Sequence, residues 1–283
     1  MHLSHPKNND NKYTRGMVTV IGGCASYPGA AVLAGCAAYA ASRAGSGYVT
    51  VFSAPENVAL IQGYKPSLVV RPWSDIEQVE SSLGASTPQR PRSYVIGPGF
   101  DAGDAYAEKL LRFVLAVDAP LVIDGGALSM LANEELCAEL HERSISGKTT
   151  VLTPHMGEAS KISQGFAIHS NEPEMLSAAI AKASGAICVL KGPVTYVSDV
   201  LCTRVMDTGT PALAKAGTGD VLAGIVGALL LHADNPLDAA FCASELHAFT
   251  ARQCICETGD IALTPEDIID KLVTSIKEYD EGR

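Results

Sequence analysis

The chain of 283 residues lacks the cysteine patterns of a zinc site or of a disulfide framework. Its eight cysteines are scattered and form no Cys-x-x-Cys pair, and the nearest two are Cys254 and Cys256. Their neighbours are mostly Ala, Val, Leu and Ile. We therefore expect buried free thiols in a protein of the reducing cytoplasm.

Positive charge and long apolar runs are also scarce. The net charge of −10 argues against binding to nucleic acid or to an anionic membrane. The most apolar stretches, 30–42 and 221–231, are shorter than a membrane span, so they indicate core helices. Residues 1–12 are polar and have no apolar segment, so we do not expect a signal peptide there.

Three common catalytic or nucleotide-binding motifs are missing. The stretch "SGKTT" at 146–150 ends like a P-loop, but Glu142 stands where the first glycine is needed and a strand follows instead of a helix. Neither 97–103 nor 217–224 has the third glycine of Gly-x-Gly-x-x-Gly, and no Gly-x-Ser-x-Gly occurs. We interpret 146–150 as a surface turn.

Short apolar runs alternate with helical segments along the chain. Strands are predicted at 17–23, 48–52, 94–99, 120–126, 149–155 and 186–192, with a hairpin over 195–205 that turns near Asp199. Helices are predicted at 30–44, 104–117, 129–141, 157–164, 172–184, 219–233, 236–256 and 265–278. Continuously apolar strands are typical of a mostly parallel sheet covered on both faces. We predict a flexible tail at 1–14 and one three-layer α/β/α domain over 15–283.

Polar residues and glycines follow the ends of several predicted strands. In sheets of this kind, ligands bind beyond the carboxyl ends of the strands. The residues at or just after those ends are Gly97, Gly99, Asp124, Thr153, His155, Glu158, Lys191 and Asp220. Their gathering predicts a site at that edge.

The stretch Gly217-Thr218-Gly219-Asp220 enters an apolar helix. The glycines allow a tight turn with amides close to a ligand, and a helix N-terminus attracts anions. Asp220 is compatible with two roles, a favourable acid in the first helical turn or a general base beside a phosphoryl group. The glycine-rich approach favours the general base.

Two further segments offer candidate ligands. In "TPHMGE", His155 is expected to project into the cleft, and Glu158 either helps to hold a hydrated Mg²⁺ or caps its helix. In "VLKGPVT", Lys191 is placed to pair with phosphate oxygens, and Lys215 in the glycine loop could do the same. Asp124 either contacts metal, water or ligand, or starts the following turn.

A glycine-rich turn also enters the first predicted helix, in "GGCASYPGAAVLAG". Tyr27 and Pro28 are candidates for a pocket wall, with the amides of Gly29 and Ala30 facing a ligand. The alternative is a tight junction between strand and helix.

Taken together, these segments resemble the NAD(P)H-hydrate dehydratase family of the ribokinase-like superfamily. The matching stretches are "VIGGCASYPGAAVLAG", "YVIGPGF", "PLVIDGGAL", "VLTPHMGEASKI", "VLKGPVT" and "TGTPALAKAGTGDVLAGIVGAL", in the family's order. The resemblance implies that ADP or ATP phosphorylates the ring hydroxyl of hydrated NADH or NADPH, and that loss of phosphate restores the double bond.

The resemblance also implies roles for individual residues. Asp220 would be the base, with an anion hole from the amides of 217–219. The adenine nucleotide would be held by Lys191, Gly192, Pro193, Val194, Thr195 and Gly219. The hydrated dinucleotide would contact Ala30, Gly97 or Gly99, and His155. Mg²⁺ would bridge the nucleotide phosphates.

The chain departs from the family's pattern at two places. The usual Asn-x-Thr-Gly-Asn is replaced by Met206-Asp207-Thr208-Gly209-Thr210, and the usual Asp-Ala-Asp by "DGG" at 124–126. No epimerase domain precedes the first strand, so an epimerase is expected as a separate protein. The family implies a homo-oligomer, with a tetramer as one form. The alternatives are a small-molecule kinase of the same superfamily, for a sugar, thiazole or pyrimidine alcohol, and a non-catalytic nucleotide-binding protein.

Overall fold

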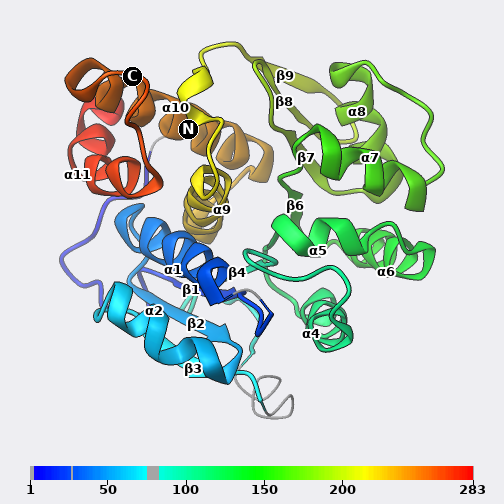
Figure 1. Cartoon of the computed structure of the whole chain (residues 1–283), viewed down its shortest axis with the longest axis horizontal. Coiled ribbons are helices and arrows are strands. Elements are labelled where there is room, and N and C mark those ends of the chain that lie inside the picture. The colour runs from blue at the N-terminus through cyan, green and yellow to red at the C-terminus, as the bar shows by residue number, and fades with distance from the viewer. Residues whose placement is uncertain (1–2, 27, 75–82, 283) are drawn as a thin grey trace.

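The computed structural model describes residues 3–26, 28–74 and 83–282, and its strands form one sheet (Figure 1). The strands are β1 (Met17–Ile21), β2 (Tyr48–Ser53), β3 (Val69–Pro72), β4 (Arg92–Ile96), β5 (Leu121–Ile123), β6 (Thr150–Leu152), β7 (Ile187–Leu190), β8 (Thr195–Ser198) and β9 (Thr203–Met206). Their order is β3-β2-β1-β4-β5-β6-β7-β8-β9. Strands β1 to β7 pair in parallel, whereas β8 and β9 are antiparallel.

Helices cover both faces of the sheet (Figure 1). One face carries α1 (Pro28–Arg43), α2 (Val58–Tyr64), α9 (Thr218–Leu229), α10 (Pro236–Thr258) and α11 (Pro265–Glu281). The other carries α4 (Ala105–Ala116), α5 (Gly125–Met130), α6 (Glu134–Ile145), α7 (Met156–Gly165) and α8 (Pro173–Ser184). Alternate strand residues serve the two cores: Val95 packs toward α9, and Tyr94 and Ile96 toward α4. The predicted three-layer, mostly parallel architecture is confirmed.

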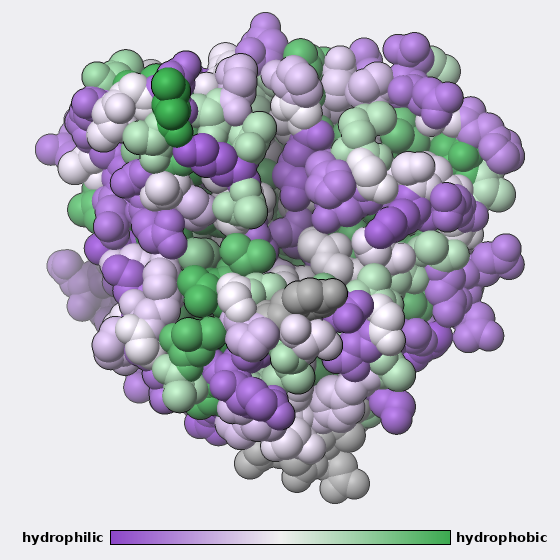
Figure 2. Space-filling view, viewed as in Figure 1, coloured by the Kyte–Doolittle hydropathy of each residue, from purple (hydrophilic) through white to green (hydrophobic). Residues whose placement is uncertain are grey.

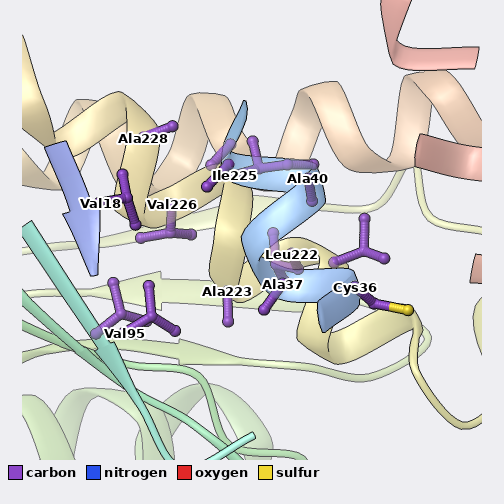
Figure 3. Close-up of a cluster of buried hydrophobic side chains, with 14 of the residues drawn as sticks. Val18, Cys36, Ala37, Ala40, Val95, Leu222, Ala223, Ile225, Val226 and Ala228 are labelled. Carbon is purple, nitrogen blue, oxygen red and sulfur yellow. The ribbon is translucent and has the colours of Figure 1, made fainter. Parts of the chain in front are cut away.

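The core between α1 and α9 is built largely from small side chains. Ala37 and Ala40 of α1 lie against Leu222 and Ile225 of α9 in Figure 3. A side chain at Gly224 would begin 2.0 Å from the carbonyl oxygen of Ala37, so the two helices touch through their backbones. Both stretches that were too short for a membrane are thus core helices, as expected. Within the described ranges, no helix has the length and apolar character needed to cross a membrane.

Several local predictions need correction. The single helix predicted over 129–141 is wrong, because the chain forms α5 and α6 with a turn between them. Asn133 accepts a hydrogen bond from the Glu135 amide at 2.8 Å and begins the second helix. Helix α2 and strand β3 were not predicted at all. The turn at Asp199 is confirmed, since its carboxylate accepts bonds from the amides of Leu201 and Cys202 at 2.8 Å.

All eight cysteines are free thiols, and six of them are buried as expected. Cys202 and Cys256 are exposed, so the prediction of burial is wrong for these two. Cys202 lies in the turn between β8 and β9, and Cys256 lies near the end of α10, on its solvent side.

The described part of the N-terminal segment contacts the rest of the chain. Leu3 packs against the core that α1, α9, α10 and α11 share, and the His5 ring lies 2.7 Å from the Asp280 carboxylate of α11. The flexibility expected of residues 1–14 stays a prediction.

Candidate active site

A cavity of about 1050 Å³ opens beyond the carboxyl ends of the parallel strands. The face seen in Figure 2 is hollowed near its centre, where hydrophilic side chains gather. The wall of the cavity includes most of the predicted site residues: Ala30, Gly99, Asp124, His155, Glu158, Lys191, Gly192, Pro193, Thr195, Lys215, Gly217, Thr218, Gly219 and Asp220. The sheet order places this cavity beside β1 and β4, where the strand order reverses and ligands of such sheets bind.

The glycine loop is held in one conformation. Gly217 has φ +94°, a backbone region that favours glycine, and a side chain there would begin 2.7 Å from Pro265 of α11. The Thr218 hydroxyl donates to the carbonyls of Leu213 and Lys215, at 2.7 and 2.9 Å. This hydroxyl therefore secures the loop. The Thr218 amide also donates to the Lys215 carbonyl at 3.4 Å, and the following amides of the first turn of α9 are the ones placed for an anion.

Asp220 lies in the first turn of α9 and is 9% exposed. Burial, reinforced by the negative charge of Asp124, raises its pKa to about 7, and the positive charge of Lys191 opposes the rise. A carboxyl group that titrates near neutral pH can accept a proton and later return it. The electrostatics therefore favour the general base over a simple helix-terminal acid.

Lys191 extends from the end of β7 toward the glycine loop. Its Nζ lies 3.0 Å from Oδ1 of Asp124, and the same oxygen accepts a bond from the Thr153 hydroxyl at 2.7 Å. A Cβ added to Gly219 would stand 2.9 Å from that ammonium, so the cation lies over the first turn of α9. Burial disfavours the charged lysine, but Asp124 and Glu158 outweigh burial and raise its pKa.

His155 and Glu158 form the N-terminal cap of α7. The Nδ1 atom of His155 accepts a bond from the Gly157 amide at 3.0 Å, and the Glu158 carboxylate accepts the His155 amide at 2.8 Å. Glu158 therefore caps its helix, which was one of the two roles expected for it. The His155 side chain remains 61% exposed and lines the cavity, so it is available to a ligand. Burial raises the pKa of Glu158, and the Asp124 charge adds to the effect.

Several predicted contacts are placed differently from the rest. Among the described residues, Gly97 and Val194 do not line the cavity. A side chain at Gly97 would begin 1.9 Å from the carbonyl oxygen of Asp124, so this glycine permits a close backbone approach. The Lys215 ammonium donates to the Ile261 carbonyl at 2.6 Å. Pro28 and Gly29 are exposed at the start of α1, and Tyr27 lies outside the described residues.

Sequence reasoning missed the wall contributed by α10. Ser244, His247 and Ala248 of this helix line the cavity. Burial lowers the pKa of His247 to about 4, so the ring is neutral at pH 7, and its Nε2 finds no hydrogen-bond partner in the described part of the chain. Nothing in the sequence of an apolar helix marks one histidine as facing a ligand.

A divalent ion would find few protein ligands in this cavity. The described residues contain no group of three His, Cys, Asp or Glu side chains that could hold a metal ion. Mg²⁺ commonly uses one or two carboxylates together with phosphate oxygens and water. The Glu158 carboxylate on the cavity wall fits that pattern for an ion carried by a nucleotide.

Comparison with known proteins agrees with this architecture. A family model described as NAD(P)H-hydrate dehydratase matches residues 18–274. An ADP-dependent (S)-NAD(P)H-hydrate dehydratase of Cenarchaeum symbiosum is 28% identical, over 97% of this chain and 93% of that protein. A bifunctional NAD(P)H-hydrate repair enzyme of Coxiella burnetii is 32% identical, over 93% of this chain and 50% of that protein. The chain thus spans about half the length of the bifunctional relatives.

Solved structures agree on the fold. A ribokinase-like protein of Enterococcus faecalis superposes with a TM-score of 0.80 at 24% identity, covering 98% of this chain and 92% of that one. A Bacillus subtilis ADP/ATP-dependent NAD(P)H-hydrate dehydratase, co-crystallised with ATP and Mg²⁺, gives 0.78 at 24% identity, covering 98% and 95%. The fold is ribokinase-like, and the family match over most of its length shows that this chain belongs to the NAD(P)H-hydrate dehydratase family.

Proposed function

We propose that this chain dehydrates hydrated NADH or NADPH at the expense of ADP or ATP. The observation that carries the proposal is Asp220, a buried carboxyl group with a pKa of about 7 beside the first amides of α9. Because the phosphoryl acceptor is a hydroxyl, the reaction needs a base of this kind next to an anion-binding turn.

The residues support two successive steps. Asp220 takes the proton of the ring hydroxyl while the hydroxyl oxygen bonds to the terminal phosphorus of the nucleotide, and the bond to the leaving phosphate oxygen breaks. The amides of 217–219 and the Lys191 ammonium stabilise the negative charge on the phosphoryl group during its transfer. The C–O bond to the phosphate then breaks and phosphate leaves with its electron pair, while a neighbouring ring carbon gives its proton to water and the C–H electrons form the double bond. Phosphorylation thus converts a poor leaving group into a good one.

The binding roles follow the cavity wall. The nucleotide lies along Lys191, Gly192, Pro193 and Thr195, with its terminal phosphate toward Gly219, and Lys215 is a further cation at the loop. The hydrated ring lies toward Ala30, Gly99 and His155 of the cavity wall. Mg²⁺, when bound, neutralises phosphate charge, with Glu158 as the carboxylate ligand offered by the chain. The enzyme works as a homo-oligomer, a tetramer being one form.

One assay tests the proposal. The purified chain is incubated with hydrated NADH or hydrated NADPH, Mg²⁺, and either ADP or ATP, and the absorbance of the reduced nicotinamide is followed. We expect recovery that requires a nucleotide and that Asp220→Asn abolishes. No recovery with any of the four pairs would refute dehydration. A stable phosphorylated small alcohol formed in its place would identify a kinase of the same superfamily.

A further inference from the structure

Asp124 is a buried carboxylate whose position suggests a helix cap that it does not make. It occupies the N-cap position of α5, yet its side chain makes no capping hydrogen bond. Asp104 at the equivalent position of α4 does cap, accepting bonds from the amides of Tyr106 and Ala107. Since Asp124 is only 2% exposed, solvation does not account for its charge either.

The carboxylate instead joins the ends of two neighbouring strands. A single oxygen, Oδ1, accepts the Thr153 hydroxyl after β6 and the Lys191 ammonium after β7. The Lys191 amide also donates to the Pro154 carbonyl at 2.8 Å, which ties the same strand ends through the backbone. The carboxylate is buried while the Lys191 side chain is 21% exposed, and such a pair requires good geometry and further hydrogen bonds, both of which are present.

The ammonium is fixed where the phosphoryl group is expected. A lysine has a flexible four-carbon stem, so its end has no preferred place without a partner. Here Nζ stands 2.9 Å from the point that a Cβ of Gly219 would occupy. The backbone of Asp124 is fixed in turn by the close approach of Gly97, where a side chain would begin 1.9 Å from the Asp124 carbonyl oxygen.

We infer that Asp124 is a positioning residue that holds the Lys191 ammonium against the first turn of α9 before the nucleotide arrives. The inference deepens the proposed function and rests on it for the reaction served. Asp124 need not touch the nucleotide. It fixes the position of the Lys191 ammonium before the reaction, whereas a lysine without this partner would have to be ordered during it. Such preorganisation lowers the barrier to phosphoryl transfer.

A double-mutant cycle tests this role. The chains are the natural one, Asp124→Asn, Lys191→Met and the double variant, and the asparagine keeps the shape while removing the charge. We expect Asp124→Asn to lower kcat about ten-fold when Lys191 is present, and less than about two-fold in the Lys191→Met chain, because coupled residues are not additive. Equal losses in both backgrounds, or no loss beside Lys191, would overturn the inference.

A binding arm is independent of turnover. The same four chains are titrated with MgATP by calorimetry without hydrated cofactor. We expect Asp124→Asn to weaken MgATP binding at least about three-fold beside Lys191 and to leave it unchanged in the Lys191→Met chain. If the four chains show this coupling in MgATP binding but the natural chain shows no dehydration, the proposed reaction fails and the positioning role stands. If dehydration is seen and the cycle is additive, only the positioning role fails.

Two controls separate positioning from folding. Asp238→Asn removes the same charge from an ion pair with Arg204 that does not line the cavity, and it should leave kcat unchanged. Thr153→Val loosens Asp124 without removing either charge, and it should lower kcat in the same direction as Asp124→Asn. A drop in Tm with unchanged kcat for both Asp124→Asn and Thr153→Val would assign Asp124 a merely structural role.

Discussion

At the scale of single residues, Asp220 combines the position proposed for the catalytic base with an unfavourable place for a charge. Its ionised form is buried and faces Asp124 and Glu158, and Lys191 only partly offsets them. The group therefore titrates near pH 7, where a proton can be exchanged in both directions.

The activity should follow this titration. Because the base must be deprotonated, kcat should be constant above about pH 8 and fall about ten-fold for each pH unit well below the pKa of about 7.

The Asp220→Asn variant should lose at least about 10³-fold in kcat, since the substitution removes both the base and its negative charge. Rate measurements from about pH 5 to about pH 9 check both, and a flat profile would contradict the assignment.

Stability should depend on pH in the opposite sense from an ordinary ion-paired aspartate. The folded pKa of Asp220 is raised, so its contribution to stability is present below the unfolded value of 3.8 and is lost as the pH rises through about 7. Asp220→Asn should therefore raise Tm at about pH 8 relative to the natural chain, and much less at about pH 5. Calorimetry at the two pH values decides, and an equal shift at both would argue against a raised pKa.

The Thr218 hydroxyl should matter for the loop more than for the ligand. Thr218→Val leaves two carbonyl oxygens without this donor and should cost about 1–3 kcal/mol of unfolding free energy. MgATP affinity should fall as well, because the loop loses its anchor. Thr250→Val is the matched control: that buried hydroxyl bonds to the Leu246 carbonyl of its own helix, so its loss should not change affinity.

At the scale of elements, the site depends on how closely α1 and α9 approach. Gly224→Ala would place a methyl group 2.0 Å from the Ala37 carbonyl oxygen, which the backbones cannot accommodate without moving apart. We expect a loss of about 3 kcal/mol or more by denaturant unfolding. Gly63→Ala, in α2 with nothing within 4 Å, is the control and should be neutral or stabilising.

A second set of elements is held by one buried guanidinium. Arg143 of α6 donates to the carbonyls of Leu115, Val117 and Thr149 and to the Thr150 hydroxyl, and it also contacts the Ala119 carbonyl. Arg143→Lys keeps the charge but cannot reach these acceptors together, so it should cost about 3 kcal/mol or more. Denaturant unfolding measures this, and Arg90→Lys on the exposed loop should cost little.

Helices, strands and the site at the strand ends could be predicted from the sequence wherever neighbouring residues determine them. Gly217 to Asp220 indicate a turn and a helix start, and the short apolar runs indicate parallel strands. The sequence could not predict that Asp124 turns from its helix toward Lys191, because that choice depends on the distance between β5 and β7. The break between α5 and α6 was hidden because leucines on both sides continue a helical spacing.

The α10 wall was missed for a different reason. His247 sits in a helix whose spacing is typical of a core, and the packing of α10 against β7, β8 and β9 brings it to the cavity. Long-range packing of this kind leaves no mark in a single sequence. The family resemblance added the remaining assignments, since a glycine loop with an acid does not name a substrate.

At the scale of the whole molecule, the cavity joins walls from both halves of the chain. Ala30 and Gly99 line it together with Lys191 and the α9 loop. A ligand that fills the cavity should therefore stabilise the whole fold, by about 2.7 kcal/mol at a concentration about one hundred times Kd. MgATP should raise Tm in the natural chain and raise it less in Lys191→Met, and an equal rise in both would place the nucleotide elsewhere.

Because the cysteines differ in burial, their rates of reaction with a thiol reagent report how readily each part of the fold opens. In a thiol-labelling experiment under native conditions, Cys202 and Cys256 should react within the mixing period, whereas Cys24, Cys36, Cys137, Cys188, Cys242 and Cys254 must wait for the chain to open. The six protected thiols are distributed over both layers of helices and the sheet itself. Mass spectrometry of the labelled peptides can therefore show, without any added probe, which layer opens first.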